Sequence, residues 1–259
     1  MGVVFLGAGG RLGRLLKPRW RGDALWATRT EVDLNNQQSL HVALGDATTV
    51  FCLAGVTHGA EARMHQNATL AAKVLDAAWQ QGGRRVFLFS SAAVYGASRG
   101  RNSVAGQTSP LSAYGRAKLE MEDVAKDHPN PCVCLRLGNV AGADAILGGW
   151  KEGFELDSFT DGTTPRRSYI GPGCLADVLS MLAQAPDLPD VMNVSAPHPV
   201  AMGDLLDAAQ LRWQRRPATD ATIADVTLDT HALEQIVAFR PEDSTATGIV
   251  GDWRGCRTS

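Results

Sequence analysis

The chain begins with a short apolar run that leads directly into a glycine-rich turn and then into the start of a helix. The run is Val3-Val4-Phe5-Leu6, whose β-branched and aromatic residues are typical of a buried parallel strand. Glycines at positions 7, 10 and 13 follow it, with the spacing GxxGxxG. A turn without side chains lets the backbone approach a pyrophosphate, which then binds at the helix N-terminus. The segment therefore predicts a dinucleotide site that includes Gly7, Gly9, Gly10, Arg11, Leu12 and Gly13.

Further apolar runs alternate with helical stretches along the first half of the chain. Strand character is found at 24–28, 49–55, 85–91 and 132–137, and helical spacing at 60–81 and 112–126. This alternation predicts an α/β fold with a doubly wound (Rossmann) parallel sheet and a smaller C-terminal substrate-binding region.

The pattern changes after Gly142, where glycines interrupt segments of mixed periodicity. We expect residues 1–142 to form the dinucleotide-binding domain, with 170–192 returning to it. Residues 143–169 and 193–259 are expected to form a substrate-binding lid. The polar, Gly/Ser-rich stretch at 97–110 predicts a loop over the active site.

The end of the second strand bears on the choice between NAD and NADP. An arginine at this position accommodates the 2′-phosphate of NADP, whereas a carboxylate binds the 2′-hydroxyl of NAD. Arg29 directly follows Thr28 and so favours NADP. Asp33 lies 20 residues beyond Gly13, which is the spacing of the acidic residue that favours NAD. We place Asp33 and Leu34 near the adenine, after a very short third strand. Arg29 and Asp33 together favour NADP slightly over NAD.

The strand at 49–55 ends in Leu53, Ala54 and Gly55, whose small last residues would let a cofactor lie close. Asn67 lies in the helix that follows, where it could be an ordinary solvated residue. Its assignment to the cofactor site comes from a family resemblance and not from its spacing.

Tyr114 and Lys118 lie four residues apart in a helical stretch, so their side chains share one face of the helix. A tyrosine ionises at about pH 10, and a fixed positive charge stabilises its phenolate. Ser91 ends the strand at 85–91, where its hydroxyl can bond a substrate oxygen beside Tyr114. These three residues are the predicted catalytic group, and Tyr114 and Lys118 also join the predicted cofactor contacts.

Composition excludes several other classes of protein. The net charge of −2 gives no basic field for nucleic acid or an anionic membrane. No apolar run is long enough to span a bilayer, and the first residues lack the basic leader of a signal peptide. The five cysteines are scattered without zinc-type spacing, and the histidines show no paired spacing. We therefore expect a cytoplasmic protein with reduced thiols and no metal.

Several motifs, taken in their order along the chain, together resemble a known family. They are the glycine loop, Ala54-Gly55, Asn67, the Ser-Ser-Ala-Ala-Val-Tyr-Gly run from Ser90, Tyr114-x-x-x-Lys118 and Leu-Arg-Leu-Gly-Asn-Val from Leu135. The chain resembles the extended short-chain dehydrogenase/reductases, and more narrowly the NAD-dependent epimerase/dehydratase group that acts on nucleotide sugars.

This resemblance implies a role for each matching residue. Tyr114 would be the acid/base, Lys118 would lower the pKa of Tyr114 and hold the nicotinamide ribose, and Ser91 would orient the substrate oxygen. The reaction would be hydride transfer between an NAD(P) cofactor and a sugar or nucleotide sugar. Substrate contacts are expected at Ser91, Ala92, Asn139 and Arg167. The resemblance also implies a homodimer through the helices at 60–81 and 112–126.

Two departures from the family pattern stand out. Dehydratases of the group carry an acidic pair after the active-site hydroxyl, and Ala92 and Ala93 occupy those positions here, so dehydration is not expected. The turn after Arg-Ser-Tyr-Ile usually reads His-Val-Asp-Asp, but here it reads Gly-Pro-Gly-Cys from Gly171. That turn has lost its carboxylates.

Several alternatives remain open from the sequence. The protein could be an epimerase or a one-way reductase, an NADPH-dependent ketoreductase of a non-sugar carbonyl, or a dinucleotide-binding regulator without catalysis. Lys118 could instead be a surface cation paired with Glu122, four residues on. Arg136 could form a local salt bridge, or it could contact the substrate.

Overall fold

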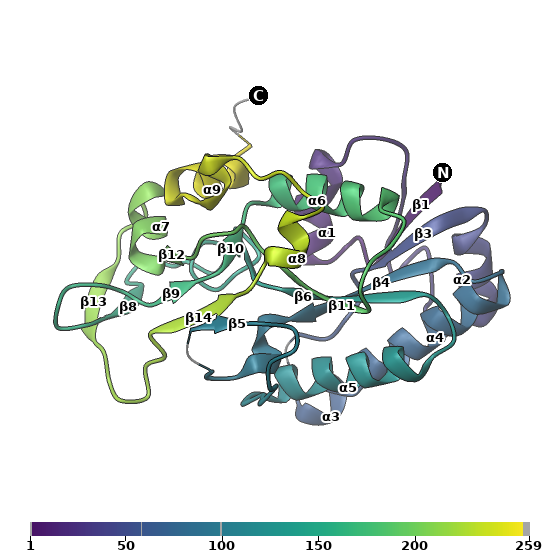
Figure 1. Cartoon of the computed structure of the whole chain (residues 1–259), viewed down its shortest axis with the longest axis horizontal. Helices are drawn as coiled ribbons and strands as arrows, with labels where there is room; N and C mark the ends of the chain where they lie inside the picture. The colour runs from purple at the N-terminus through teal and green to yellow at the C-terminus, as the bar shows by residue number, and fades with distance from the viewer. Residues whose placement is uncertain (1, 58, 99, 256–259) are drawn as a thin grey trace. The chain divides into compact units, whose positions relative to one another are not determined.

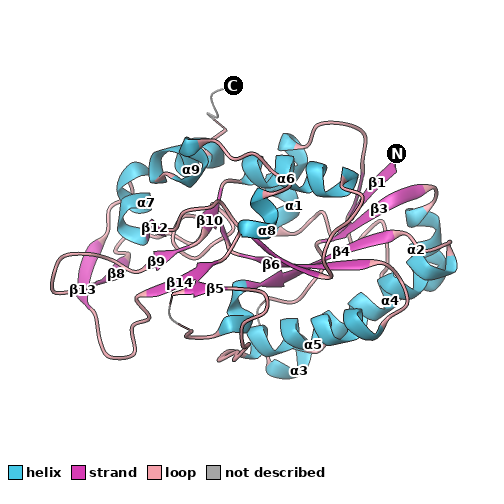
Figure 2. Ribbon diagram, in the orientation of Figure 1, coloured by secondary structure: helices cyan, strands magenta, loops and turns pink. Residues whose placement is uncertain are grey.

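A six-stranded sheet organises the first part of the structure, with the strand order β11-β6-β4-β3-β1-β2. The pairings among β1, β2, β3 and β4 are parallel. Figure 1 shows α4 and α5 running side by side along the sheet, and Figure 2 separates strands from helices by colour. The arrangement confirms the predicted doubly wound fold. The strands are β1 (Gly2–Leu6), β2 (Leu25–Ala27), β3 (Ala47–Cys52), β4 (Arg85–Ser91), β6 (Cys132–Leu137) and β11 (Val191–Val194).

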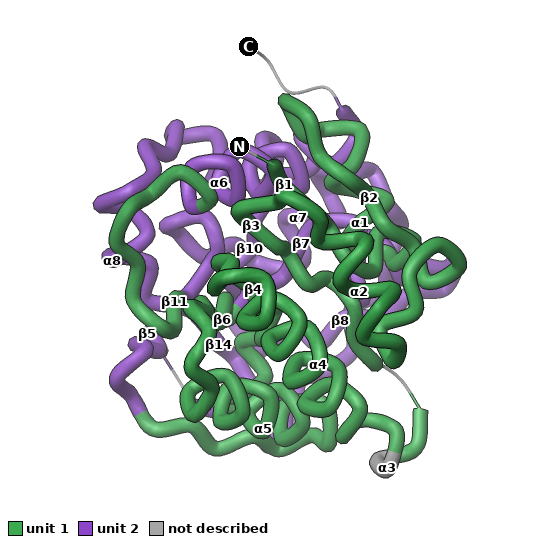
Figure 3. The backbone as a smooth tube through the Cα atoms, turned by 90° about the vertical axis from the view of Figure 1, so that its right-hand side faces the viewer, with its two compact units in different colours: residues 1–96, 107–136, 183–192 green, residues 97–106, 137–182, 193–259 purple. Residues whose placement is uncertain are grey.

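This computed structural model describes residues 2–57, 59–98 and 100–255, and it divides into two units. The first consists of residues 1–96, 107–136 and 183–192, and the second of residues 97–106, 137–182 and 193–259, apart from those outside the described ranges (Figure 3). In the described part of the chain, no helix is both long enough and apolar enough to cross a membrane.

One aromatic side chain from each of four neighbouring strands fixes the register of the sheet. Phe5 stacks on Trp26 at 3.9 Å between ring centroids and on Phe51 at 4.8 Å, and Phe51 stacks on Phe87 at 4.7 Å. The same residues are register partners in the strand pairings. Because a slip of one residue would turn every one of these rings to the opposite face, the aromatic row defines the alignment of β2, β1, β3 and β4.

The helices of the first unit follow the sequence prediction in part. The stretch predicted as one helix at 60–81 is divided at His65 into α3 and α4, whereas the stretch at 112–126 is confirmed as α5, capped by the Ser112 hydroxyl. The helices are α1 (Arg11–Leu16), the 3-10 turn η1 (Lys17–Arg19), α2 (Gln37–Leu44), α3 (Glu61–Met64), α4 (Gln66–Gln80), the 3-10 turn η2 (Ala92–Tyr95) and α5 (Ala113–Asp127).

The third strand expected just before Asp33 is wrong, because the segment after β2 folds as a turn. The Glu31 carboxylate accepts hydrogen bonds from the backbone N–H and the hydroxyl of Thr28, both at 2.8 Å. Asn36 then caps α2 by accepting from the Ser39 N–H at 3.0 Å. Local side-chain bonds of this kind compete with strand formation.

The second unit is built from short strands and three longer helices around its own apolar core. A four-stranded sheet has the order β12-β9-β14-β5, and β8 and β13 pair separately. Part of the stretch predicted as a loop at 97–110 is a strand, since β5 pairs with β14. The elements are β5 (Arg101–Asn102), β7 (Asn139–Val140), β8 (Glu155–Ser158), β9 (Arg166–Arg167), β10 (Tyr169–Ile170), α6 (Pro172–Gln184), β12 (Val200–Ala201), α7 (Met202–Ala208), β13 (Gln214–Pro217), β14 (Asp225–Leu228), α8 (His231–Glu234), η3 (Pro241–Ser244) and α9 (Ala246–Trp253).

A carboxylate from α9 binds the first turn of α6. The two oxygens of Asp252 accept from the N–H groups of Gly173 at 3.0 Å and Cys174 at 2.8 Å. A Cβ at Gly171 or Gly173 would lie 2.1 or 2.2 Å from these oxygens, so the turn needs glycine at both positions. The turn that lacks carboxylates in its own sequence is therefore capped by one supplied 79 residues away.

If Asp252 caps α6, its removal should lower the stability of the protein. Asp252→Ala leaves two N–H groups at the start of α6 without acceptors, so we expect the free energy of unfolding to fall by about 2 kcal/mol. Thermal and urea denaturation followed by circular dichroism would measure the loss. Asp204→Ala, which removes an exposed carboxylate in the first turn of α7, is the control. Equal stabilities for the two variants would contradict the cap.

Candidate active site and cofactor pocket

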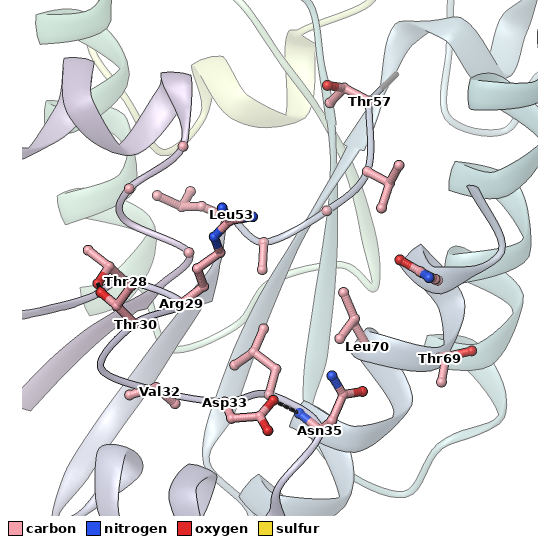
Figure 4. A pocket seen from close by; sticks show the side chains of 18 of the residues that line it. Thr28, Arg29, Thr30, Val32, Asp33, Asn35, Leu53, Thr57, Thr69 and Leu70 are labelled. Carbon is pink, nitrogen blue, oxygen red and sulfur yellow. Dashed lines mark hydrogen bonds between the residues drawn. The ribbon is translucent and has the colours of Figure 1, made fainter. Parts of the chain in front are cut away.

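A cavity of about 1110 Å³ in the first unit brings together most of the predicted cofactor residues (Figure 4). It lies at the glycine turn after β1, the loop after β2, the end of β3 and the start of α4. The predicted residues that line it are Gly7, Gly9, Gly10, Arg29, Asp33, Leu34, Leu53, Ala54 and Gly55. Arg11, Leu12 and Gly13 form the first turn of α1, which begins directly after the glycine turn.

Two of the glycines are required by the fold itself. Gly7 has a φ of +84°, and a Cβ there would lie 2.6 Å from the backbone nitrogen of Ala54. A Cβ at Gly13 would lie 2.3 Å from the carbonyl oxygen of Ala8. A Cβ at Gly9, in contrast, would meet only the Thr28 side chain, at an ordinary 3.6 Å. The absence of a side chain at Gly9 thus keeps cavity space open rather than allowing internal packing.

The loop after β2 presents an arginine and two hydroxyls to the cavity. Figure 4 shows the Arg29 side chain extending from this loop into the pocket, with Thr28 and Thr30 beside it. The hydroxyls of Thr28 and Thr30 are 2.8 Å apart. Glu31 is held by Thr28, and these hydrogen bonds keep the pKa of its carboxyl below the ordinary value. The Asp33 carboxylate accepts from the Asn35 N–H at 2.9 Å.

The predicted catalytic residues lie close together. The Ser91 hydroxyl is the polar neighbour that acts on the pKa of Tyr114, and the Lys118 Nζ is 5.8 Å from the centroid of the Tyr114 ring. Burial raises the pKa of Tyr114, and the bond from Ser91 offsets part of that rise. Ser91 Oγ also accepts from the Ala93 N–H at 3.1 Å, which caps the η2 turn that begins at Ala92.

Lys118 is buried, so the alternative prediction, that it is a surface cation paired with Glu122, is wrong. Only 4% of its surface is exposed, and burial lowers the pKa of its ammonium to about 8 from 10.5. A Cβ at Gly55 would lie 3.3 Å from Nζ and 2.6 Å from the Asn67 Oδ1. Glycine at position 55 therefore allows both polar side chains to approach the end of β3.

Asn67 is a structural anchor for that same segment and is not solvated. Its amide donates to the carbonyl oxygens of Val56 at 3.1 Å and Met64 at 2.8 Å, and its Oδ1 accepts from the Val56 N–H at 3.0 Å. Asn67 therefore fixes the backbone just after Gly55 against the α3–α4 junction.

Arg136 forms a local ion pair, which decides between its two alternatives. Its guanidinium binds the Glu122 carboxylate, with Nη2 2.7 Å from Oε2, and both residues are buried. Burial alone would lower the pKa of Arg136, but hydrogen bonds to Glu122 and Tyr95 raise it above the ordinary value. Glu122 is thus the partner of Arg136 rather than of Lys118.

The two remaining predicted substrate residues belong to the second unit. Asn139 pairs with Tyr169 between β7 and β10, and its N–H donates to the Ser168 carbonyl at 2.9 Å. The Arg167 guanidinium donates to the carbonyl oxygens of Arg166 at 2.7 Å, Ile223 at 2.9 Å and Ala224 at 3.1 Å. Their contact with a substrate stays a prediction.

Some pocket residues were missed by the sequence analysis. Thr28 and Thr30 were visible as hydroxyls on either side of Arg29, and that pattern could have indicated them. Arg63 and Gln66 line the cavity from the junction of α3 and α4. They gave no signal, because the sequence pattern over 60–81 predicts one continuous helix with no junction.

Comparisons with known proteins identify the family of the chain. The model of the NAD dependent epimerase/dehydratase family matches residues 10–171 of the chain. No curated protein sequence gives a significant match.

Solved structures show the same fold at low sequence identity. The NAD-dependent NDP-hexosamine 5,6-dehydratase TunA, of tunicamycin biosynthesis, is 19% identical, with a TM-score of 0.73 and 98% of each chain covered. The UDP-Glc/GlcNAc 4-epimerase of Campylobacter jejuni is 16% identical, with a TM-score of 0.79 and 98% of each chain covered. The dTDP-4-dehydrorhamnose reductase of Bacillus anthracis, in complex with NADP, is 16% identical, with a TM-score of 0.78 and 98% of each chain covered.

The family match begins at Gly10 and includes Gly13, the pocket residues from Arg14 to Leu70, and the Ser91, Tyr114 and Lys118 group. It confirms the resemblance found in the sequence: the chain belongs to the NAD-dependent epimerase/dehydratase family of enzymes.

Proposed function

We propose that this enzyme transfers hydride between NADP and a sugar or nucleotide sugar, as an epimerase or a reductase, with Tyr114 as the acid/base. The observation that carries the proposal is the grouping of Ser91 and Tyr114 beside the buried ammonium of Lys118. A regulator that had lost catalysis would have no use for this group. Nucleotide sugars are favoured because relatives act on them, among them a UDP-Glc/GlcNAc 4-epimerase.

The pocket fits a dinucleotide in size and in its backbone. Its volume of about 1110 Å³ is larger than a single small substrate needs. Gly9 leaves open space where any other residue would place a Cβ, and that space lies at the start of α1. Gly9, Gly10 and the first turn of α1 would hold the pyrophosphate, and Ala54 and Gly55 would lie against the nicotinamide half. When bound, the nicotinamide accepts or supplies the hydride.

Tyr114, Ser91 and Lys118 would carry out the proton transfer that accompanies the hydride transfer. Burial keeps the Tyr114 phenol protonated at neutral pH, ready to donate to a substrate oxygen that becomes a hydroxyl. The Ser91 hydroxyl fixes the phenol and can bond the same substrate oxygen. The positive charge of Lys118 would stabilise the phenolate that remains after the proton leaves. Reversal of these roles would serve oxidation.

The preference for NADP rests on the loop after β2. Arg29 reaches into the pocket, where its guanidinium suits a 2′-phosphate. The carboxylates of Glu31 and Asp33 already accept backbone N–H groups of the loop. A carboxylate has two acceptor oxygens, so these bonds do not prevent it from binding a ribose hydroxyl, and the preference for NADP rests on Arg29.

Epimerisation and reduction are both compatible with the site, whereas dehydration is not. Ala92 and Ala93 provide no acid or base at the positions where dehydratases of the group have an acidic pair. An NADPH-dependent ketoreductase of a non-sugar carbonyl is the second candidate, favoured by the same Arg29 loop.

A homodimer through α4 and α5 also stays a proposal. The two helices pack against each other in the first unit (Figure 1). Trp79, half exposed near the end of α4, is the largest apolar side chain available to such a contact on these helices.

The first prediction concerns cofactor choice. We expect NADPH to bind more tightly than NADH, and Arg29→Ala to weaken NADPH binding by roughly 10- to 100-fold, since a charged hydrogen bond to the 2′-phosphate is lost. Titration followed by energy transfer from tryptophan to the nicotinamide would measure both. Arg21→Ala, at an exposed arginine before β2, is the control. Binding of neither dinucleotide would refute the function.

A second prediction concerns two glycines of the turn: Gly9 is expected to leave room for the ligand, whereas Gly7 is needed by the fold. Gly9→Ala should leave the melting temperature unchanged but weaken dinucleotide binding at least tenfold, because its Cβ occupies cavity space. Gly7→Ala should destabilise the protein by about 1 kcal/mol or more, because its φ is positive and Ala54 lies too close. Differential scanning fluorimetry and the same titration would test both. Equal melting temperatures would show that the two glycines play the same part.

A third prediction follows from the burial of Lys118. Its pKa is about 8 in the folded protein and about 10.5 when unfolded, so the unfolded state binds the extra proton between these values. Wild-type stability therefore rises with pH across this window, and the full cost of the buried charge is present below pH 8. Lys118→Met should be more stable at pH 7 by up to about 3 kcal/mol, and this advantage should vanish toward pH 10.5.

Urea denaturation at a series of pH values would measure the advantage of Lys118→Met. Lys126→Met, at an exposed position of the same helix, is the control and should keep the wild-type pH dependence. If the stability advantage of Lys118→Met over the wild type does not change with pH, Lys118 is not a buried ammonium in the folded protein.

A further inference from the structure

Four polar side chains form a buried network in the first unit that the proposed chemistry does not use. They are Ser90 on β4, Tyr95 at the end of η2, Glu122 on α5 and Arg136 on β6, and at most 7% of any of them is exposed. Buried polar groups of this kind are costly unless every one is paired. The pairing here is extensive, and it connects β4, η2, α5 and β6.

The network is built on a two-pronged ion pair. Arg136 Nε lies 3.1 and 3.2 Å from the two Glu122 oxygens, and Nη2 lies 2.7 Å from Oε2. Arg136 Nη1 donates to the Tyr95 hydroxyl at 3.0 Å, and the Ser90 hydroxyl donates to Glu122 Oε1. A planar guanidinium that binds through several nitrogens fixes direction as well as distance.

The anchored residues lie on both sides of the active-site hydroxyl. Ser90 directly precedes Ser91, and Tyr95 ends the 3-10 turn that Ser91 caps. Glu122 lies on the same helix as Tyr114 and Lys118, one turn after Lys118. The network therefore ties both ends of the Ser91 segment to the helix that carries the other two catalytic residues.

A second contact shows how close these two segments are. A Cβ at Gly115, which follows Tyr114, would lie 2.5 Å from the carbonyl oxygen of Ala93. The start of α5 therefore rests directly on the η2 turn, and a small movement of either would change the distance between Ser91 and Tyr114.

We propose that Glu122 and Arg136 are positioning residues, whose paired hydrogen bonds hold the Ser91 segment and the Tyr114–Lys118 helix at the separation that catalysis needs. The inference rests on the proposed roles of Ser91, Tyr114 and Lys118. Stability alone does not account for the pair, because apolar residues of similar volume commonly replace a buried ion pair without loss. An apolar pair would fill the space but could not fix the hydroxyls of Ser90 and Tyr95.

The test uses the tyrosine signals of the protein, of which the chain has only three, Tyr95, Tyr114 and Tyr169. With ¹³Cζ-labelled tyrosine, NMR at a series of pH values gives the pKa of Tyr114, assigned with Tyr114→Phe. The bond from Ser91 lowers that pKa, so Ser91→Ala should raise it and provides the reference for a lost contact.

The decisive variant replaces both charges, Glu122→Leu together with Arg136→Met, which leaves the net charge near Tyr114 unchanged. Either single replacement should lower the melting temperature by on the order of 10 °C, because it strands a buried charge, and the double variant should recover much of that loss. We expect the double variant to fold while its Tyr114 pKa rises toward the value in Ser91→Ala. Glu120→Gln, which removes an exposed partner of His65 on the same helix, should leave the Tyr114 pKa at the wild-type value.

A folded double variant in which Tyr114 titrates as in the wild type would overturn the proposal. If the double variant does not fold, Ser90→Ala removes one hydroxyl of the network and gives the same measurement, with a rise expected and an unchanged pKa overturning the proposal. The measurement needs neither cofactor nor substrate. Failure of the dinucleotide titration therefore counts against the proposed function, whereas an unmoved Tyr114 signal counts against the positioning pair.

Discussion

A lysine ammonium buried among the strands of the first unit is the constraint on which the site depends. Lys118 is 4% exposed, and burial brings its pKa to about 8. Cys52 gives it no compensating charge, because burial raises the pKa of that thiol to about 11. The nearby carboxylate of Glu122 binds Arg136 and is neutralised there. Lys118 therefore has no carboxylate of its own among the ion pairs of the described residues, which would suit the phenolate of the proposed acid/base, Tyr114.

The backbone around Lys118 is shaped to let polar groups approach one another. Gly55 leaves room for Nζ and for Asn67, and Asn67 in turn fixes the chain at Val56 and Met64. Gly115 lets α5 rest on the turn that Ser91 caps. A Cβ at Gly55 would lie 2.6 Å from the Asn67 side chain, and one at Gly115 would lie 2.5 Å from the Ala93 backbone, so the absence of both side chains sets the separation of the predicted catalytic groups.

The sequence allowed the sheet and most of the site to be predicted, because both depend on local patterns. The glycine turn, the strand-end Ser91 and the Tyr114–Lys118 spacing each follow from a few neighbouring residues. The errors arose where side chains redirect the backbone: the Thr28–Glu31 bonds replace a strand with a turn, and the break at His65 divides a helix whose apolar pattern continues. The burial of Lys118 could not be predicted, since Glu122 lies four residues after it, the spacing of an ordinary ion pair on a helix surface. Only the folded structure shows that Glu122 binds Arg136 instead.

The turn at Gly171 shows why a departure from a family motif does not by itself mean a lost structure. The N–H groups at the start of α6 need an acceptor, and an acceptor can come from any part of the chain that reaches them. Here α9 supplies Asp252, and the glycines at 171 and 173 leave room for its carboxylate, since a Cβ at either position would lie 2.1 or 2.2 Å from an oxygen. The missing local carboxylates and the two glycines therefore fit the same contact with Asp252. Asp252 gave no sign of this role in the sequence, since its spacing from the turn is set by the fold alone.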